Sequence, residues 1–314
     1  MRIVSLLPSA TEILFVLGLD REVVGVSHEC DFPPQARTKP VVIHSRLPHG
    51  GSPAEIDRLV REYVSRGESL YAVDAQKLEE LHPDLIITQD LCHVCAASPD
   101  DLATALARFD GRPEVLCLNP QDLGDVWRDI LLVGEATCRG PQAEQLVDEI
   151  GQRQGALKQQ LNSTSRRPRV AFLEWLEPIY VGGHWVPEMI HCSGGEDALG
   201  KARTPSFRVH LQVVVEAEPD ILLIAPCGYA AKQARKEYES LDLPEQWNAI
   251  PAVRNNRVYA LEANSYFSRP GPRLVTGIEI LAKIIQPSVV VSPEAESAIL
   301  RIPSERAVGR AASF

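Results

Sequence analysis

Long hydrophobic runs are missing from the sequence, and so is a basic leader of the secretory type. No stretch reaches the roughly 18 uninterrupted apolar residues of a membrane-spanning helix, so we expect no membrane insertion. The N-terminus enters a predicted strand almost at once and has no basic region followed by a small-residue cleavage site. We therefore expect a cytoplasmic protein from the sequence as written, or a periplasmic or extracellular one if a leader has been removed.

Positive charge is in the minority and scattered along the chain. Lys and Arg number 32 against 42 Asp and Glu, which gives a formal net charge of -10. A chain of this sign repels the phosphates of nucleic acids, and it has no polybasic run of the kind that binds membrane surfaces. We expect neither nucleic acid nor membrane among the partners.

Several common catalytic motifs are also missing. The sequence has no phosphate-binding Gly-Lys loop, no Gly-x-Ser-x-Gly and no His-Glu-x-x-His. Its composition, 45% hydrophobic and 24% charged, is that of a globular protein, and 314 residues suffice for two domains. The sequence therefore favours a binding protein over an enzyme.

Predicted strands alternate with helices along most of the chain, which is typical of mostly parallel sheets. A long helical pattern from 121 to 161 separates two halves and should kink or break near 138–141, and the last clear helix starts near 272. Ser9 and Glu12 have capping-box spacing at the start of a first helix, about 10–17. The expected strands are 3–6, 23–26, 70–73, 85–88, 115–118, 170–173, 221–224 and 258–261.

The two halves resemble each other. Pro83-Asp84 and Pro219-Asp220 each precede a buried strand, and they flank the long helical pattern. The predicted fold class is therefore α/β, with two Rossmann-like lobes of mostly parallel sheet joined by a long backbone helix. The expected parts are an N-terminal α/β lobe (1–120), a connecting helix and linker (121–167), a C-terminal α/β lobe (168–287) and a partly ordered tail (288–314).

Polar and aromatic residues gather just after the predicted strands. Ligands of open parallel sheets bind beyond the carboxyl ends of the strands, so we expect a ligand in a cleft between the lobes. The candidate ligand-binding residues are Pro8, Ser9, His28, Glu29, Cys30, Trp175, His184, Trp185, Glu188, Tyr229, Tyr266, Arg269 and Arg273.

These residues suit a large, flat and partly polar ligand. The aromatic side chains Trp175, Trp185, Tyr229, Tyr266 and Phe267 would form walls against a ring system, although packing within the protein is an alternative. The arginines would orient polar groups of the ligand. His184 would be an axial ligand to cobalt or iron, or else an ordinary hydrogen-bonding residue.

A Cys-x-x-Cys pair, Cys92 and Cys95, suggests a separate chemistry. It supplies half of a tetrahedral zinc site or a redox pair, which Cys30 or His28 would complete. The alternative is that two small side chains pack at the end of a strand. Zinc or iron at Cys92 and Cys95 is therefore one of two interpretations.

The segment 5–13 (SLLPSATEI), the Pro-Asp strand and the long middle helix resemble the class III substrate-binding proteins over roughly residues 1–287. Within that class, segments 27–34, 92–95 and 183–188 resemble a branch usually labelled cobalamin-binding. The resemblance implies a substrate-binding component of an ABC-type uptake system, or a cytoplasmic relative of one. It would bind a metal chelate such as cobalamin or another corrinoid, need no cofactor, and have an ABC transporter membrane subunit as partner. The alternative is a cytoplasmic enzyme or a metal or redox sensor that uses the Cys and His residues.

Overall fold

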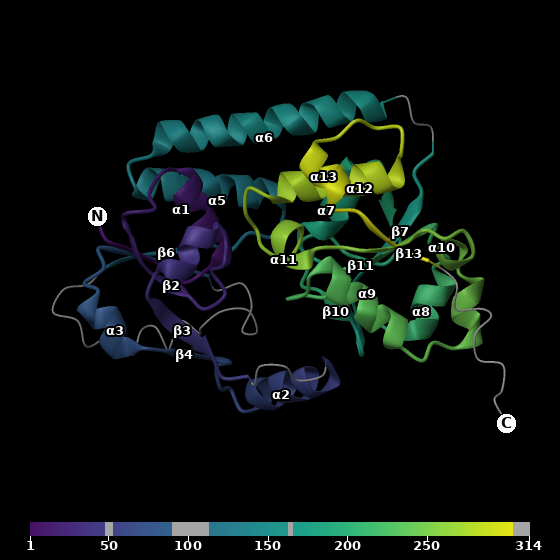
Figure 1. Ribbon diagram of the computed structural model, residues 1–314, viewed down its shortest axis with the longest axis horizontal. Helices are drawn as coiled ribbons and strands as arrows, with labels where there is room; N and C mark the ends of the chain where they lie inside the picture. Colours follow the sequence, from purple (N-terminus) through teal and green to yellow (C-terminus); the bar gives the residue numbers. More distant parts are fainter. Residues whose placement is uncertain (48–52, 90–112, 163–165, 304–314) are drawn as a thin grey trace. The chain divides into compact units, whose positions relative to one another are not determined.

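The computed structural model describes residues 1–47, 53–89, 113–162 and 166–303 (Figure 1). The chain divides into two compact units, each with its own sheet. Two separate sheets with surrounding helices confirm the predicted α/β class. Unit 1 comprises Met1–Pro120, Gly124–Ile150 and Pro270–Pro272, and unit 2 comprises Gln121–Leu123, Gly151–Arg269 and Arg273–Phe314.

The sheet of unit 1 has six strands in the order β4-β3-β2-β1-β5-β6. All neighbours are parallel except β3 and β4. The strands are β1 (Ile3–Ser5), β2 (Val23–Ser27), β3 (Val41–Ser45), β4 (Tyr71–Val73), β5 (Leu85–Thr88) and β6 (Glu114–Cys117). The helices are α1 (Pro8–Val16), η1 (Pro34–Thr38), α2 (Pro53–Ser65), α3 (Ala75–Glu80) and α5 (Leu123–Ala136). The sequence analysis missed β3, because only three apolar residues lie between Pro40 and His44.

The first helix begins earlier than predicted. Pro8 occupies its first turn, where a fixed φ and a missing N–H cost nothing, and the N-cap Leu7 makes no side-chain capping hydrogen bond. Ser9 and Glu12 are buried inside the helix, at 4% and 3% exposure. The capping-box prediction is therefore wrong, since the proline moves the helix start ahead of Ser9.

The sheet of unit 2 follows the order β10-β8-β7-β11-β12-β13, with β9 paired to β7. β7, β11 and β12 are mutually parallel, whereas β8, β10 and β13 each pair antiparallel with a neighbour. The strands are β7 (Arg169–Leu176), β8 (Ile179–Val181), β9 (Glu196–Asp197), β10 (Phe207–Arg208), β11 (Ile221–Ile224), β12 (Val258–Ala260) and β13 (Leu300–Ile302).

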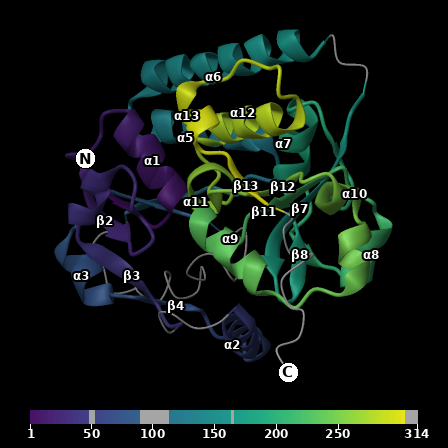
Figure 2. The ribbon, with the colours of Figure 1, turned by 45° about the vertical axis from the view of Figure 1, so that its right-hand side comes forward.

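Helices cover both faces of this second sheet. In Figures 1 and 2, α7, α12 and α13 lie on one side of it, and α8 and α9 lie on the other. The helices are α7 (Val186–Cys192), α8 (Leu211–Glu216), α9 (Ala231–Ser240), η2 (Glu245–Ala249), α10 (Pro251–Arg254), α11 (Ala263–Tyr266), α12 (Leu274–Ile285) and α13 (Pro293–Ser297). The two-sided cover explains why Ile221 to Ile224 of β11 are all fully buried.

Two segments of unit 2 differ from the prediction. Segment 174–188, expected to be a loop, contains the end of β7 and the antiparallel strand β8. The segment 288–314, expected to be a partly ordered tail, contains α13 and β13, and Ile302 pairs with Val258 of β12. Both new strands are three residues long, too short for a hydrophobic period to be recognised.

The long helical pattern is interrupted where the sequence predicted. Cys138 has a φ of 55° between α5 and α6 (Gly140–Leu161). A Cβ on Gly134 would lie only 2.4 Å from Cβ of Ala143, so the close approach of the two helices requires glycine there. Among the described residues, no helix is long and apolar enough to cross a membrane.

Candidate binding faces of the two units

In unit 2, three loops meet at the carboxyl ends of parallel strands. β7, β11 and β12 run the same way, so the residues that follow them lie at one edge of the sheet. The N–H of Cys227 donates to the carbonyl of Glu174 (3.1 Å), and the N–H of Ala263 donates to the carbonyl of Tyr229 (3.2 Å). Backbone hydrogen bonds therefore join the segments after β11 and β12 to each other and to the last residues of β7, and this edge is where open α/β sheets hold ligands.

An aromatic pair stands at this edge. The rings of Trp175 and Tyr229 lie edge to face, with centroids 5.8 Å apart and an interplanar angle of 65°. The indole N–H of Trp175 donates to the carbonyl of Glu177 (3.2 Å), which holds the ring in place. Both rings are half-buried, so part of each faces outward. We call Trp175, Glu177, Tyr229 and Glu237 the aromatic-acidic face.

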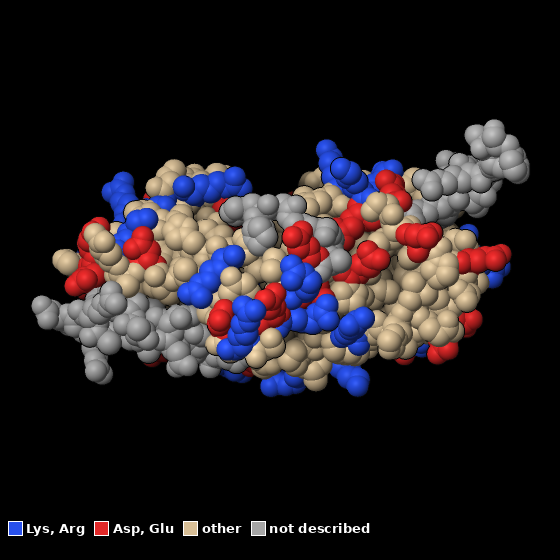
Figure 3. All heavy atoms as spheres, turned by 90° about the horizontal axis from the view of Figure 1, so that it is seen from below, with Lys and Arg blue, Asp and Glu red and all other residues tan. Residues whose placement is uncertain are grey.

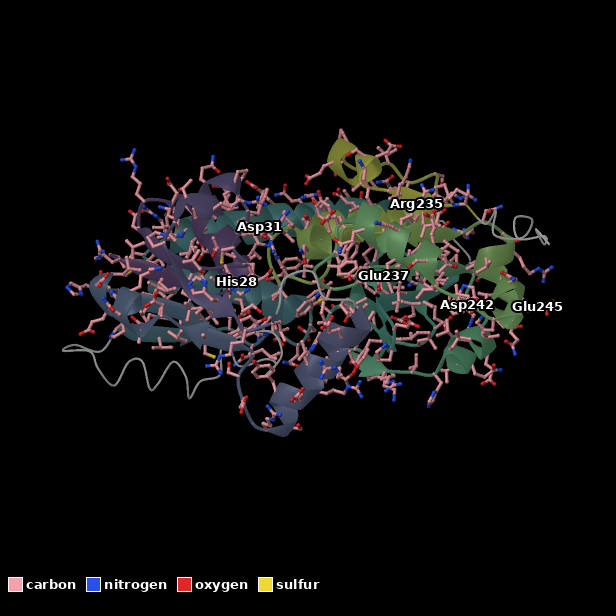
Figure 4. All side chains as sticks on the ribbon, turned by 60° about the horizontal axis from the view of Figure 1, so that its bottom comes forward. His28, Asp31, Arg235, Glu237, Asp242 and Glu245 are labelled. Atoms are coloured by element: carbon pink, nitrogen blue, oxygen red, sulfur yellow. The ribbon has the colours of Figure 1, made fainter. Side chains whose placement is uncertain are left out.

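Two carboxyl groups border the aromatic pair. Burial raises the pKa of Glu237, a hydrogen bond with Tyr229 opposes the shift, and the charge of Glu177 adds to it. Burial, together with the charge of Glu237 and its hydrogen bond, raises the pKa of Tyr229 to about 12. Oε1 of Glu237 is buried and has no hydrogen-bond partner among the described residues. Figure 4 shows Glu237 and Arg235 on α9.

A second polar cluster lies around Glu174. Its carboxyl accepts a hydrogen bond from the hydroxyl of Ser206. Burial raises the pKa of Glu174 to about 7, against the effect of Ser206 and with a further contribution from the charge of Asp197. Oδ1 of Asp197 accepts from the N–H groups of Leu199 (2.9 Å) and Gly200 (2.6 Å). This cluster holds the segment after β9 against β7.

Trp185 is a structural residue in this structure, not a ligand wall. It is 5% exposed, and its indole N–H donates to the carbonyl of Phe267 (2.8 Å). Phe267 is 2% exposed and packs against Phe172, with ring centroids 5.4 Å apart. Neither side chain offers surface to a ligand in this structure, which favours the alternative that Trp185 and Phe267 pack within the protein.

His184 lies away from the strand ends because β8 runs backward. The N–H of Gly182 donates to the carbonyl of Phe172, four residues before the end of β7. His184 has a φ of 48° and its ring stacks on Trp185, with centroids 5.5 Å apart. Burial lowers its pKa, which favours the neutral ring. The antiparallel hairpin, unseen in the sequence, therefore separates His184 from Trp175.

The other candidates of unit 2 have partners within the unit. Oε2 of Glu188 accepts from the N–H of Leu123 (2.9 Å), the first residue of α5. The hydroxyl of Tyr266 donates to Glu294 (3.0 Å), and the guanidinium of Arg273 lies 5.8 Å from the Tyr266 ring centroid. Arg269 is half-buried. Tyr266 and Arg273 remain a second, smaller outward-facing group.

Of the five candidates in unit 1, two lie inside the core and three are partly or fully exposed. Ser9 and Cys30 are 4% and 3% exposed, and Sγ of Cys30 lies 3.0 Å from Oγ1 of Thr11. Nδ1 of His28 lies 3.0 Å from the carbonyl of Ile43, and its Nε2 lies 3.3 Å from a carboxyl oxygen of Glu29. Pro8 is half-buried in the first turn of α1. His28, which is labelled in Figure 4, and Glu29 are therefore the residues of unit 1 best placed to meet a ligand.

The predicted metal site falls largely outside the described residues. Cys92 and Cys95 lie in the segment 90–112, and the third candidate ligand, Cys30, is buried beside Thr11. Within the part of the chain that the structure describes, no group of three His, Cys, Asp or Glu side chains is arranged to hold a metal ion. Zinc or iron at Cys92 and Cys95 stays a prediction.

Sequence reasoning missed the acidic members of the unit 2 site. Glu237 lies in α9, whose charged sequence AKQARKEYES is typical of a solvated helix. Glu177 follows the end of β7 directly, and that position was a usable signal. On the face shown in Figure 3, acidic and basic side chains are interspersed.

Comparison with known proteins agrees with this architecture. A family model described as "Periplasmic binding protein" matches residues 3–265. An uncharacterized ABC transporter substrate-binding lipoprotein, YvrC of Bacillus subtilis, is 26% identical over 91% of this chain and 80% of its own. A vitamin B12-binding protein of Vibrio parahaemolyticus is 23% identical over 88% of this chain and 86% of its own.

Solved structures share the fold. The periplasmic heme-binding protein RhuT of Roseiflexus sp. RS-1, in its apo form, superimposes with a TM-score of 0.68 at 24% identity. The match covers 91% of this chain and 98% of that one. The family model matches most of this chain, and the two α/β units around separate sheets agree with it. The chain therefore belongs to the periplasmic binding protein family, as its resemblance to class III members implied.

Proposed function

We propose that this protein is the substrate-binding component of an ABC-type uptake system and that its ligand is a corrinoid, with cobalamin as the first candidate. The observation that carries the proposal is the Trp175–Tyr229 pair, which lies where the end of β7 is hydrogen-bonded to the segments that follow β11 and β12. Relatives named for vitamin B12 binding match 88% of this chain in several species, which supports the choice of ligand. The relative YvrC, named as a transporter lipoprotein, supports the transport role and a membrane subunit as partner.

The proposed role is reversible binding without chemistry. Aromatic surface such as the Trp175–Tyr229 pair suits a large flat ring, because covering one face of an indole contributes on the order of 1–3 kcal/mol. The ligand is then expected to leave the protein with its mass and visible spectrum unchanged. A changed mass after incubation would indicate an enzyme instead.

The test is a titration followed by the visible absorbance of the chelate. Cyanocobalamin, hemin and a ferric hydroxamate siderophore are added in separate series to the intact protein. We expect cobalamin to bind with a dissociation constant below about 1 mM. Trp175→Ala should weaken that binding about fivefold or more, because the ring loses its apolar contact.

The matched control is Trp127→Ala, which removes a half-buried tryptophan of α5 outside the aromatic-acidic face. Thermal unfolding of both variants shows that each is folded at the temperature of the titration. If none of the three chelates changes the absorbance signal, the proposed function is wrong.

A further inference from the structure

The acidic part of the aromatic-acidic face selects among ligands. Resting on the proposed function, we propose that Glu177 and Glu237 make this protein prefer chelates whose periphery carries amides or positive charge over chelates whose periphery carries carboxylates. The specificity-determining residues are thus two carboxylates beside the aromatic pair, and the ligand class they favour is the amide-bearing corrinoid.

Glu177 and Glu237 both adjoin the aromatic pair, Glu177 through its backbone and Glu237 through its side chain. Trp175 donates its indole N–H to the carbonyl of Glu177, so the ring and this residue are held together. Tyr229 contacts the Trp175 ring edge to face, and the Glu237 side chain lies close enough for its charge to raise the pKa of Tyr229. A ring lying on Trp175 and Tyr229 therefore brings its peripheral substituents near Glu237 and near Glu177, whose charge acts on Glu237.

Among the described residues, these two carboxyls lack compensating positive charge. Neither Glu177 nor Glu237 forms an ion pair with Lys or Arg within the described ranges. Oε1 of Glu237 is shielded from solvent and accepts no hydrogen bond from the described residues. Because no cation of the described residues pairs with these carboxyls, an N–H group or a positive charge of a ligand beside them interacts favourably with their negative charge.

The neighbouring arginine does not neutralise this site. Arg235 pairs with Glu239 through Nε and Oε1 at 2.7 Å. Residues two positions apart on an α-helix point about 200° apart around its axis. Arg235 and Glu237, both labelled in Figure 4, therefore project from opposite sides of α9. The aromatic-acidic face consequently carries net negative charge.

The peripheral groups of the ligand decide how it interacts with these carboxyls. A primary amide donates N–H to a carboxylate, and a cationic chelate is attracted to it, whereas a peripheral carboxylate is repelled at the same distance. Like charges brought together at an interface are a strong source of discrimination between partners. The ring alone, which all these chelates share, gives no such discrimination.

Two corrinoids that differ only in their peripheral groups test whether Glu177 and Glu237 discriminate between amides and carboxylates. Dicyanocobinamide carries amides around the ring, and dicyanocobyrinic acid carries carboxylates at the same positions. Both are titrated at neutral pH against the wild-type protein and against Glu177→Gln, Glu237→Gln and the control Glu239→Gln. The control removes an exposed carboxyl of α9 that already pairs with Arg235. The measured quantity is the ratio of the two dissociation constants in each protein.

We expect the wild-type protein to bind the amide ligand about tenfold or more tightly than the carboxylate ligand, since one close like-charge contact suffices for this. Glu177→Gln and Glu237→Gln should each reduce the ratio by about threefold or more, and Glu239→Gln should leave it unchanged. A ratio near one in the wild type, or a ratio that both Gln variants leave unchanged, overturns the inference while the proposed function stands. Failure of both corrinoids, of cyanocobalamin and of hemin to bind overturns the proposed function itself.

Discussion

Arg153 and Glu279 form a two-point ion pair that joins α6 to α12 within unit 2. Nε and Nη2 of Arg153 each lie 2.9 Å from one carboxyl oxygen of Glu279. The hydroxyl of Ser292 donates to the same carboxyl (2.5 Å), and Glu279 is 8% exposed. Parallel hydrogen bonds of this kind fix geometry as well as adding stability, so the pair sets how the second half of α6 packs on α12.

We predict that Glu279→Gln lowers the free energy of unfolding by about 2 kcal/mol at pH 7, because it weakens charge-assisted hydrogen bonds around a largely buried group. Burial alone would raise the pKa of Glu279, but Arg153 and Ser292 lower it below 4.5 overall. The stabilisation is therefore complete above pH 4.5 and is lost as the pH falls through the lower folded value. Urea unfolding of wild type and variant at pH 7 and at pH 3 measures the difference, which should shrink at the lower pH. A difference that stays constant over this range would contradict the assignment.

Glu174 should show the opposite dependence on pH. Its pKa of about 7 lies above the ordinary 4.5, so the folded protein holds a proton that the unfolded chain releases. Stability is then lost as the pH rises from 4.5 through 7. Glu174→Gln keeps an acceptor for Ser206 and removes the charge, so it should be the more stable protein at pH 8, by on the order of 2 kcal/mol. Thermal unfolding at pH 5 and pH 8 tests this; equal shifts at both values would refute it.

Substitutions of Trp175 and Trp185 should differ in their effects on stability. Trp185→Phe leaves the buried carbonyl of Phe267 without its donor, and we expect a loss of about 1–2 kcal/mol in stability with the affinity for cobalamin kept within about threefold. Trp175→Phe removes only a bond to the exposed residue Glu177 and should change stability by less than about 0.5 kcal/mol. Urea unfolding and ligand titration of both variants provide the comparison. A stability loss that is as large in Trp175→Phe as in Trp185→Phe would contradict it.

Gly183 should not tolerate a side chain. A Cβ there would lie 2.3 Å from the carbonyl oxygen of Thr204 and 2.6 Å from the nitrogen of Ser206, both backbone atoms. Gly183→Ala should therefore destabilise the protein by about 1–3 kcal/mol. The control is Gly155→Ala in α6, where no heavy atom lies within 4 Å and alanine should stabilise by up to about 1 kcal/mol. Thermal unfolding of the two variants should shift in opposite directions.

The elements that have a local sequence pattern of their own were predicted correctly. The parallel strands β1, β2, β5, β7, β11 and β12 are apolar runs between turn residues, and they were found. The break near Cys138 was found because Gly140 and Pro141 follow it directly. Such signals are local, so neighbouring residues alone suffice to identify them.

What the sequence did not predict depends on pairing over distance. β8 and β13 exist because β7 and β12 offer free edges to them, and neither short strand has a period of its own. Position after a strand also did not separate half-buried Trp175 from buried Trp185, because the hairpin turns the chain back between them. The acidic members of the site were missed for the same reason, since Glu237 reaches Tyr229 from a different element.

The pairing of β13 with β12 has a practical consequence for shortened forms of the protein. A chain ending at residue 287, the boundary expected from sequence, would leave the N–H and C=O groups of Val258–Ala260 without partners along one edge. An open, apolar edge of this kind recruits strands from other molecules and promotes aggregation. In the full chain, the outermost strand is only three residues long and carries Arg301 at its centre, two features that discourage such association. By covering the edge of β12, β13 therefore reduces the tendency of the protein to aggregate through that edge.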